Sequence, residues 1–187
     1  FTSAALAAVL LGAAASHGAA PVRYAAAASL DGVPAADTGD PGVQGAPFTC
    51  AAVSEIPVSE CEALVALYVS TNGPGWANRS GWLVTPTPCQ WYGITCIPGH
   101  IHVIDLIANQ LAGPVPSSIG NLRELQFLFL DHNELTGPLP PTLPQLTKLI
   151  SIEMDNNKLT GYLLPELSTL PLLLNFDVDN NLFTGPI

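Results

Sequence analysis

The chain has 187 residues, four cysteines and a formal net charge of −10, with 15 acidic side chains against five Lys and Arg. Nucleic-acid binding needs a basic surface, so this charge excludes a nucleic-acid partner. The sequence has no phosphate-binding glycine loop, no G-x-S-x-G and no H-E-x-x-H. We therefore predict no enzyme and no cofactor.

The first 18 residues resemble the end of a secretory signal peptide. Residues 4–15 form an apolar run of 12 residues, too short to span a bilayer. Small residues Ser16 and Gly18 allow cleavage after Gly18. No Met or basic flank precedes the run, so we expect Phe1 to lie within a longer leader and the protein to be secreted or displayed at the cell surface. The alternative is an Ala-rich disordered tail.

Residues 19–47 are rich in Ala, Gly, Pro and Asp and have no apolar periodicity. This composition predicts a disordered stretch.

The segment from Val58 to Ser70 is predicted to be a helix. Ser59 and Glu62 have the spacing of a capping box, and the run from Asn72 to Gly75 would stop the helix. One helical face is apolar and carries Leu64, Leu67 and Tyr68.

A tryptophan- and cysteine-rich segment follows the helix. Trp76 and Trp82 precede a C-x-W-x-G-x-x-C block that begins at Cys89 and ends at Cys96. Together with the helix, these residues give a compact unit over 48–101. We expect this unit to cap the repeats that come next, because a bare terminal repeat would expose its core.

Residues 102–187 repeat with a period of 24 residues, which predicts a solenoid of three complete repeats and one partial repeat. An asparagine column is followed four residues later by a glycine column, and it is preceded three residues earlier by an apolar column. The asparagines are Asn109, Asn133, Asn157 and Asn181; the glycines are Gly113, Gly137, Gly161 and Gly185; the apolar residues are Leu106, Leu130, Met154 and Val178.

Each repeat begins with a predicted short strand of alternating residues. Ile104 and Leu106 would point inward and Asp105 outward, and the equivalent residues of the later repeats would alternate in the same way. The asparagines would bond buried backbone groups where the chain leaves the strand. Gly-Pro steps disfavour regular α-helix on the outer wall, so we expect 3₁₀ turns and extended chain there.

The repeat pattern, L-x-L-x-x-N-x-L-x-G-x-[IVL]-P, resembles the plant-type leucine-rich repeat, and the C-x-W-x-G-x-x-C block resembles the N-terminal cap of that family. Leu164 and Leu182 depart from the pattern. The resemblance implies an α/β solenoid: a right-handed coil, a parallel sheet on the concave face, 3₁₀ and extended segments on the convex face, and a helical, disulfide-bonded cap. Since the pattern stops mid-repeat at Ile187, we expect further repeats.

The cap family implies a disulfide between Cys89 and Cys96, leaving Cys50 and Cys61 as a second pair. The residues alone allow three connectivities. An alternative is a zinc site with ligands Cys89, Cys96, His100 and His102, but this spacing fits no common zinc pattern. We therefore predict no metal site.

Acidic and aromatic residues should line the concave face, where stacked strands lie about 5 Å apart. The candidate binding residues are Asp105, Phe127, Phe129, Asp131, His132, Glu153, Asp155, Asp177 and Asp179. These carboxylates are either a solvated surface open to water, a docking strip for a basic or sugar-bearing partner, or a catalytic pair or calcium site. Open carboxylates do not suit catalysis, whereas an exposed Phe129 suggests a contact surface.

We therefore expect an extracellular recognition module that binds a protein, peptide or glycan on its concave face, without catalysis. The alternatives are the ectodomain or accessory region of a larger receptor kinase or extracellular enzyme, and an inhibitor of secreted polysaccharide hydrolases. A membrane would be reached only through an anchor outside this sequence. Asn78, in Asn-Arg-Ser, is a candidate glycosylation acceptor in a eukaryotic host.

Overall fold

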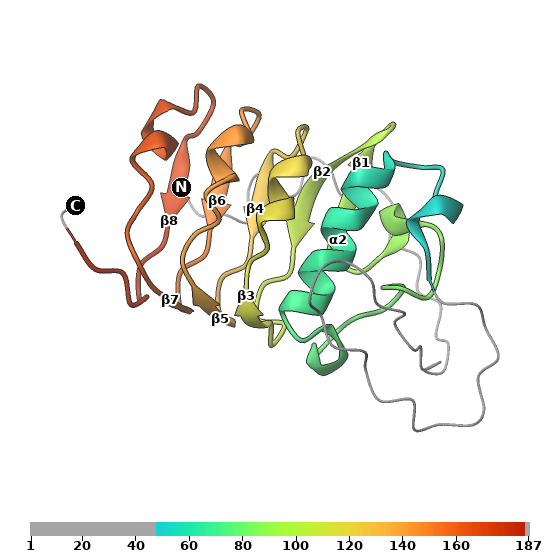
Figure 1. The fold of residues 1–187 in the computed structure, drawn as a ribbon, viewed down its shortest axis with the longest axis horizontal. Helices are drawn as coiled ribbons and strands as arrows, with labels where there is room; N and C mark the ends of the chain where they lie inside the picture. Colours follow the sequence, from blue (N-terminus) through green and yellow to red (C-terminus); the bar gives the residue numbers. More distant parts are fainter. Residues whose placement is uncertain (1–47, 186–187) are drawn as a thin grey trace.

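The structure is a computed structural model that describes residues 48–185 (Figure 1). The predicted signal peptide over 1–18 and the predicted disordered stretch over 19–47 lie outside the described residues. Within 48–185, no helix is long and apolar enough to cross a membrane.

A five-stranded sheet forms one wall of the molecule, in the order β1-β2-β4-β6-β8. Its strands are β1 (Ile94–Ile97), β2 (His100–Asp105), β4 (Phe127–Phe129), β6 (Ser151–Glu153) and β8 (Asn175–Asp177). β1 and β2 pair antiparallel, while β2, β4, β6 and β8 pair parallel. The parallel strands are 24 residues apart in register, as the period predicts, since Ile104 pairs with Leu128 and Leu128 with Ile152.

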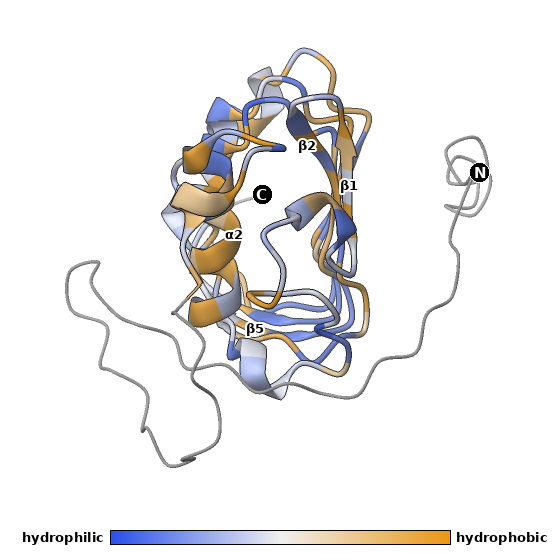
Figure 2. Ribbon diagram, turned by 90° about the vertical axis from the view of Figure 1, so that its right-hand side faces the viewer, coloured by the Kyte–Doolittle hydropathy of each residue, from blue (hydrophilic) through white to orange (hydrophobic). Residues whose placement is uncertain are grey.

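Two further walls complete each coil, as Figure 2 shows in a view along the solenoid. A short parallel sheet contains β3 (Ala112–Pro114), β5 (Glu134–Gly137) and β7 (Lys158–Leu159). The wall opposite the large sheet holds 3₁₀ turns: η4 (Ser117–Asn121), η5 (Leu143–Gln145) and η6 (Pro165–Thr169). The expected 3₁₀ and extended character of this outer wall is confirmed.

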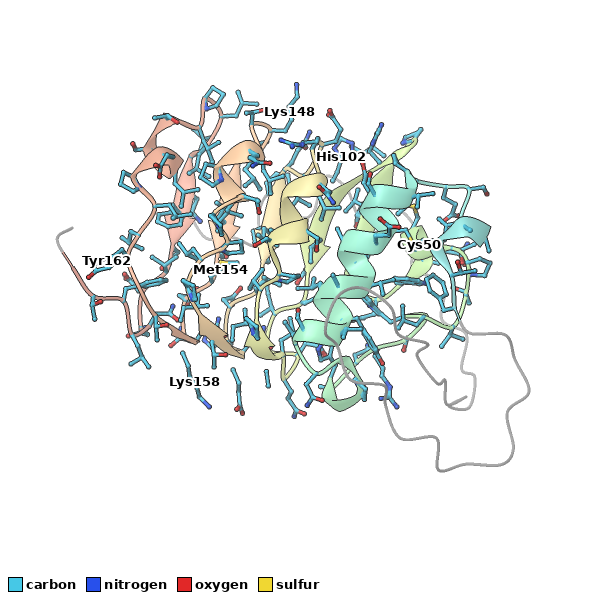
Figure 3. The ribbon with its side chains drawn as sticks, viewed as in Figure 1. Cys50, His102, Lys148, Met154, Lys158 and Tyr162 are labelled. Atoms are coloured by element: carbon cyan, nitrogen blue, oxygen red, sulfur yellow. A yellow bond between two sulfur atoms is a disulfide. The ribbon has the colours of Figure 1, made fainter. Side chains whose placement is uncertain are left out.

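The inward columns are buried between these walls. Ile104, Leu128 and Ile152 have no exposed surface, and Met154 is likewise enclosed (Figure 3). Burying such a side chain stabilises the fold by roughly 1.5–3 kcal/mol. In the last coil, Phe176 and Val178 are only partly buried, because no further described coil packs on them.

The asparagine column bonds one coil to the next. Oδ1 of Asn133 accepts the amides of Asn109 and Leu111 at 3.0 Å, and its Nδ2 donates to carbonyls including that of Leu106 at 2.9 Å. Asn157 and Asn181 repeat this arrangement one and two coils later. Each asparagine therefore satisfies backbone groups that the turn would otherwise bury without partners.

The cap begins with η1 (Cys50–Ala52) and the helix α2 (Val58–Ser70), whose predicted bounds are confirmed. The predicted capping box is wrong. Pro57 is the N-cap residue and no side chain caps the helix, because Ser59 already lies inside the first turn, where it cannot serve as the N-cap. The short turns η2 (Gly73–Gly75) and η3 (Pro88–Gln90) follow before β1.

Aromatic rings fill the space between α2 and the sheet. Trp76, Trp82 and Trp91 are almost completely buried, and Trp82 contacts Trp76 and Trp91 with ring centroids 4.8 and 5.0 Å apart. Disulfides join Cys50 to Cys61 and Cys89 to Cys96. Cys89 and Cys96 are therefore not available as thiolates, which excludes the alternative zinc site.

At its C-terminal end, α2 approaches the first coil. Gly113 lies against the carbonyl of Ser70 with a φ of 128°, and a Cβ there would overlap that oxygen. The first glycine of the repeat column thus lets the helix dock on the coil.

Candidate functional site

The outward side chains of the large sheet form three rows that run across the stacked coils, and we call this surface the concave face. The first row is Val103, Phe127, Ser151 and Asn175; the second is Asp105, Phe129, Glu153 and Asp177. The third row, just after the strands, is Ile107, Asp131, Asp155 and Asp179. The backbone ladder continues into it, since the amide of Ala108 donates to the carbonyl of Asp131 at 3.0 Å.

Two phenylalanines stand side by side on β4. Phe127 and Phe129 are both half-buried, and their ring centroids lie 5.8 Å apart at an interplanar angle of 43°. Phe129 pairs in register with Asp105 on β2 and Glu153 on β6. It therefore has a carboxylate residue on each neighbouring strand, whereas Phe127 lies between the uncharged Val103 and Ser151.

The expectation that the carboxylates lie open to water is wrong for Asp131 and Asp155 of the third row, whereas Asp179 is exposed. Asp131 is only 7% exposed, and Asp155 is half-buried. Nδ1 of His132 bonds Oδ2 of Asp131 at 2.9 Å, and Nδ2 of Asn156 donates to Oδ2 of Asp155 in the next coil. The sequence-adjacent residue thus folds back over each of these two carboxylates.

A left-handed backbone causes this folding back. Ala108, His132, Asn156 and Asn180 all have a positive φ, between 50° and 55°. Asn and His tolerate this conformation better than most residues do. A His or Asn directly before each of Asn133, Asn157 and Asn181 in the asparagine column is the sequence signal for this left-handed turn.

Two titratable groups of this face have shifted pKa values. The hydrogen bond that His132 donates to Asp131 raises the pKa of His132, and the charge of Asp155, 4.0 Å away, adds to the effect. Burial raises the pKa of Asp105, and the negative charge of Asp131 raises it further. Asp105 and Asp131, on neighbouring coils, therefore act on one another as like charges.

Not all carboxylate oxygens on this face are bonded within the described chain. Oε1 of Glu153 accepts from Oγ of Ser151 at 3.2 Å and from Nδ2 of Asn175 at 3.0 Å. Asp105 and Asp177 each accept the amide two residues later. Oδ1 of Asp131 is buried and has no hydrogen-bond partner among the described residues.

Among the described residues, the Lys and Arg side chains lie outside the concave face. The segments that supply the three rows contain six carboxylates and no Lys or Arg. Lys148 and Lys158 point away from the solenoid at its two edges (Figure 3), and Lys158 bonds Glu134 at 2.9 Å. Arg123 bonds Gln145. The concave face is consequently the acidic side of a chain that is acidic overall.

The remaining candidates lie away from this face. Among residues 48–185, no group of three or more His, Cys, Asp and Glu side chains could hold a metal ion. His100 bonds the buried Glu60, a contact that the sequence did not predict.

The candidate glycosylation acceptor Asn78 is half-buried. Its backbone amide and carbonyl both bond the side chain of Asn109, the first residue of the asparagine column. An apolar hollow of about 310 Å³ lies on the last coil between Leu164, Leu173 and Phe176.

Comparison with known proteins identifies similar chains. The leucine-rich-repeat family model matches residues 124–146. The leucine-rich repeat receptor protein kinase EMS1 of Arabidopsis thaliana is 32% identical over 85 residues, which cover 44% of this chain and 7% of that relative. The chain thus spans a small part of the length of this relative.

Solved structures are similar over a larger share of the chain. The PEPR1–AtPEP1 complex superposes with a TM-score of 0.60 at 26% identity, over 69% of this chain and 19% of that one. The Arabidopsis receptor kinase HAESA, solved with the peptide hormone IDA and the co-receptor SERK1, gives a TM-score of 0.54 at 25% identity. That match covers 67% of this chain and 22% of the HAESA chain.

Proposed function

Because the chain is a plant-type leucine-rich-repeat protein, we propose that it is an extracellular recognition module that binds a basic peptide or protein segment on its concave face. In this proposal residues 48–101 act as the cap and residues 102–187 as the repeats, after a signal peptide over 1–18 and a disordered Ala/Pro/Gly-rich stretch over 19–47. Recognition, without catalysis, is the function of this part of the protein.

The row that runs from Asp105 through Phe129 to Glu153 and Asp177 carries this proposal. Three carboxylates and an aromatic ring in one line make an extended surface that is complementary to a positively charged chain. The absence of Lys and Arg from the segments of the concave face leaves the cation to be supplied by the partner.

Two further observations support the peptide class and the location. The receptor kinase HAESA, similar to this chain at 25% identity, was solved in complex with a peptide hormone. Two disulfides suit an oxidising compartment, so we place the protein outside the cell or at its surface. The alternative of an ectodomain of a larger receptor kinase is consistent with the same relatives.

The test is selection from a random dodecapeptide phage library on the immobilised 187-residue chain, in about 0.15 M salt, at which the screening length is about 8 Å. A concave-face variant, Asp105→Lys with Glu153→Lys, is compared with an opposite-wall variant, Glu62→Lys with Glu166→Lys. The two variants change the net charge equally, and Glu62 and Glu166 are exposed on α2 and η6.

We expect enriched peptides to bind the native chain and the opposite-wall variant, and to lose binding to the concave-face variant. Equal loss in both variants would indicate attraction to net charge alone. That result, or a library without enrichment, contradicts the proposed function.

A further inference from the structure

Phe129 exposes part of its ring on a strand whose two neighbours carry acids at the same register position. Asp105 and Glu153 pair with it on β2 and β6. Adjacent strands are about 4.8 Å apart, so the two acidic residues stand roughly 10 Å apart with the ring between them. A group that lies on the ring therefore has a carboxylate on either side.

Both of these carboxylates retain bonding capacity. Oδ1 of Asp105 accepts the amide of Ile107, and Oε1 of Glu153 accepts from Ser151 and Asn175. In the described part of the chain, no hydrogen bond reaches Oδ2 of Asp105 or Oε2 of Glu153. Each residue thus offers one acceptor oxygen to an outside donor.

Asp131 is covered by His132 and does not belong to the subsite, but it adds negative charge near this position. It follows Phe129 by two residues, is only 7% exposed, and its Oδ1 has no hydrogen-bond partner in residues 48–185. The negative charge of Asp131 also acts on Asp105. Burial and this charge both raise the pKa of Asp105. Like charges held close together cost free energy, and a cation between them offsets that cost.

We propose that Phe129, flanked by Asp105 and Glu153, forms a subsite for one arginine side chain of the ligand. This inference rests on the proposed function. A guanidinium is planar, so it stacks on an aromatic ring and at the same time donates N–H groups sideways to carboxylates. A lysine ammonium carries the same charge but cannot combine these contacts in one plane.

Phe127 provides a matched control on the same strand. It is also half-buried and points to the same face, but its register partners Val103 and Ser151 are uncharged. If only an apolar surface mattered, the two phenylalanines would be equivalent. If arginine binds between two carboxylates, only Phe129 should matter strongly.

The experiment uses synthetic versions of the peptides enriched from the dodecapeptide library, with calorimetric titration of the 187-residue chain. We expect an arginine at one position of these peptides. Replacing it by citrulline, which keeps the shape and removes the charge, should weaken binding at least tenfold, because the cation–π contact and the ionic hydrogen bonds are lost. Replacing it by lysine, which keeps the charge, should weaken binding about threefold.

Among protein variants, Phe129→Leu and Asp105→Asn should each weaken binding of the arginine-containing peptide several-fold. Phe127→Leu should change the affinity for this peptide less than twofold. The citrulline peptide should bind the native chain and Phe129→Leu equally. Thermal unfolding of each variant checks whether the fold is retained. The half-buried positions of Phe127 and Phe129 make leucine a mild replacement.

The outcomes separate the two proposals. Peptides that bind the concave face with no arginine requirement overturn the arginine subsite and leave the proposed function standing. An equal effect of Phe127→Leu and Phe129→Leu also overturns the subsite. A library without concave-face binders overturns both.

Discussion

Glu60 and His100 join the cap to the first strand of the solenoid, with Oε1 of Glu60 2.6 Å from Nδ1 of His100. The second oxygen, Oε2, accepts the amide of Ile101 at 2.9 Å. Glu60 is only 2% exposed, although it lies on a helix whose other buried residues are mostly apolar. Its carboxylate thus holds α2 against the start of β2.

Loss of this contact should loosen the cap. Glu60→Ala leaves the buried amide of Ile101 without an acceptor, so we expect the free energy of unfolding to fall by about 1–3 kcal/mol. Glu60→Gln, which keeps one acceptor oxygen, should cost less. Urea unfolding followed by tryptophan fluorescence measures this, since Trp76, Trp82 and Trp91 all lie in the cap. Glu62→Ala, exposed on the same helix, is the control; an equal loss there would refute this role of Glu60.

His132 should titrate above an ordinary histidine, because Asp131 accepts its hydrogen bond and Asp155 lies nearby. A raised folded-state pKa means that the contribution of His132 to stability is fully present below its unfolded pKa and is lost as pH rises through the folded pKa. Proton NMR titration of the ring gives the midpoint. Asp131→Asn should lower it, and an unchanged midpoint would show that Asp131 is not the cause.

Substitutions in the asparagine column should lower the free energy of unfolding more than most other substitutions. Asn133→Ala removes the acceptor of two amides, those of Asn109 and Leu111, and the donor to three carbonyls. We expect a loss of about 3 kcal/mol or more, because each unsatisfied buried group costs about 1–3 kcal/mol. Asn180→Gly is the control: Asn180 is exposed, and glycine accepts its positive φ. A denaturation midpoint for Asn133→Ala close to that of this control would contradict the prediction.

The folded protein should contain no free thiol. Both cysteine pairs are bonded, and Cys61 is completely buried. Alkylation without reductant, followed by mass spectrometry, should therefore add no label, and reduction should expose four sites. Replacing Cys50 and Cys61 by Ser should lower the free energy of unfolding by about 2–4 kcal/mol. Two labelled cysteines in unreduced protein would show that one disulfide does not form.

The repeat period made much of this fold predictable. Each coil contacts its neighbours through the same columns, so a pattern such as Leu106, Leu130 and Met154 predicts burial and register together. The bounds of α2 were predictable because glycine and proline stop it soon after Ser70. The capping box failed because Ser59 lies inside the first turn and not at the N-cap, and the Ser-x-x-Glu spacing does not distinguish these two positions.

For the candidate site, the strict 24-residue period is enough to predict which residues share a row, since it places Asp105, Phe129 and Glu153 on adjacent strands. Which carboxylates are accessible to solvent depends on the tertiary structure. Asp131 and Asp155 are covered because the next residue, in a left-handed turn, folds back on each. Backbone conformation and long-range contacts such as that of Glu60 with Ile101 arise from the packing of distant segments. The local periodicity of the sequence therefore does not predict them.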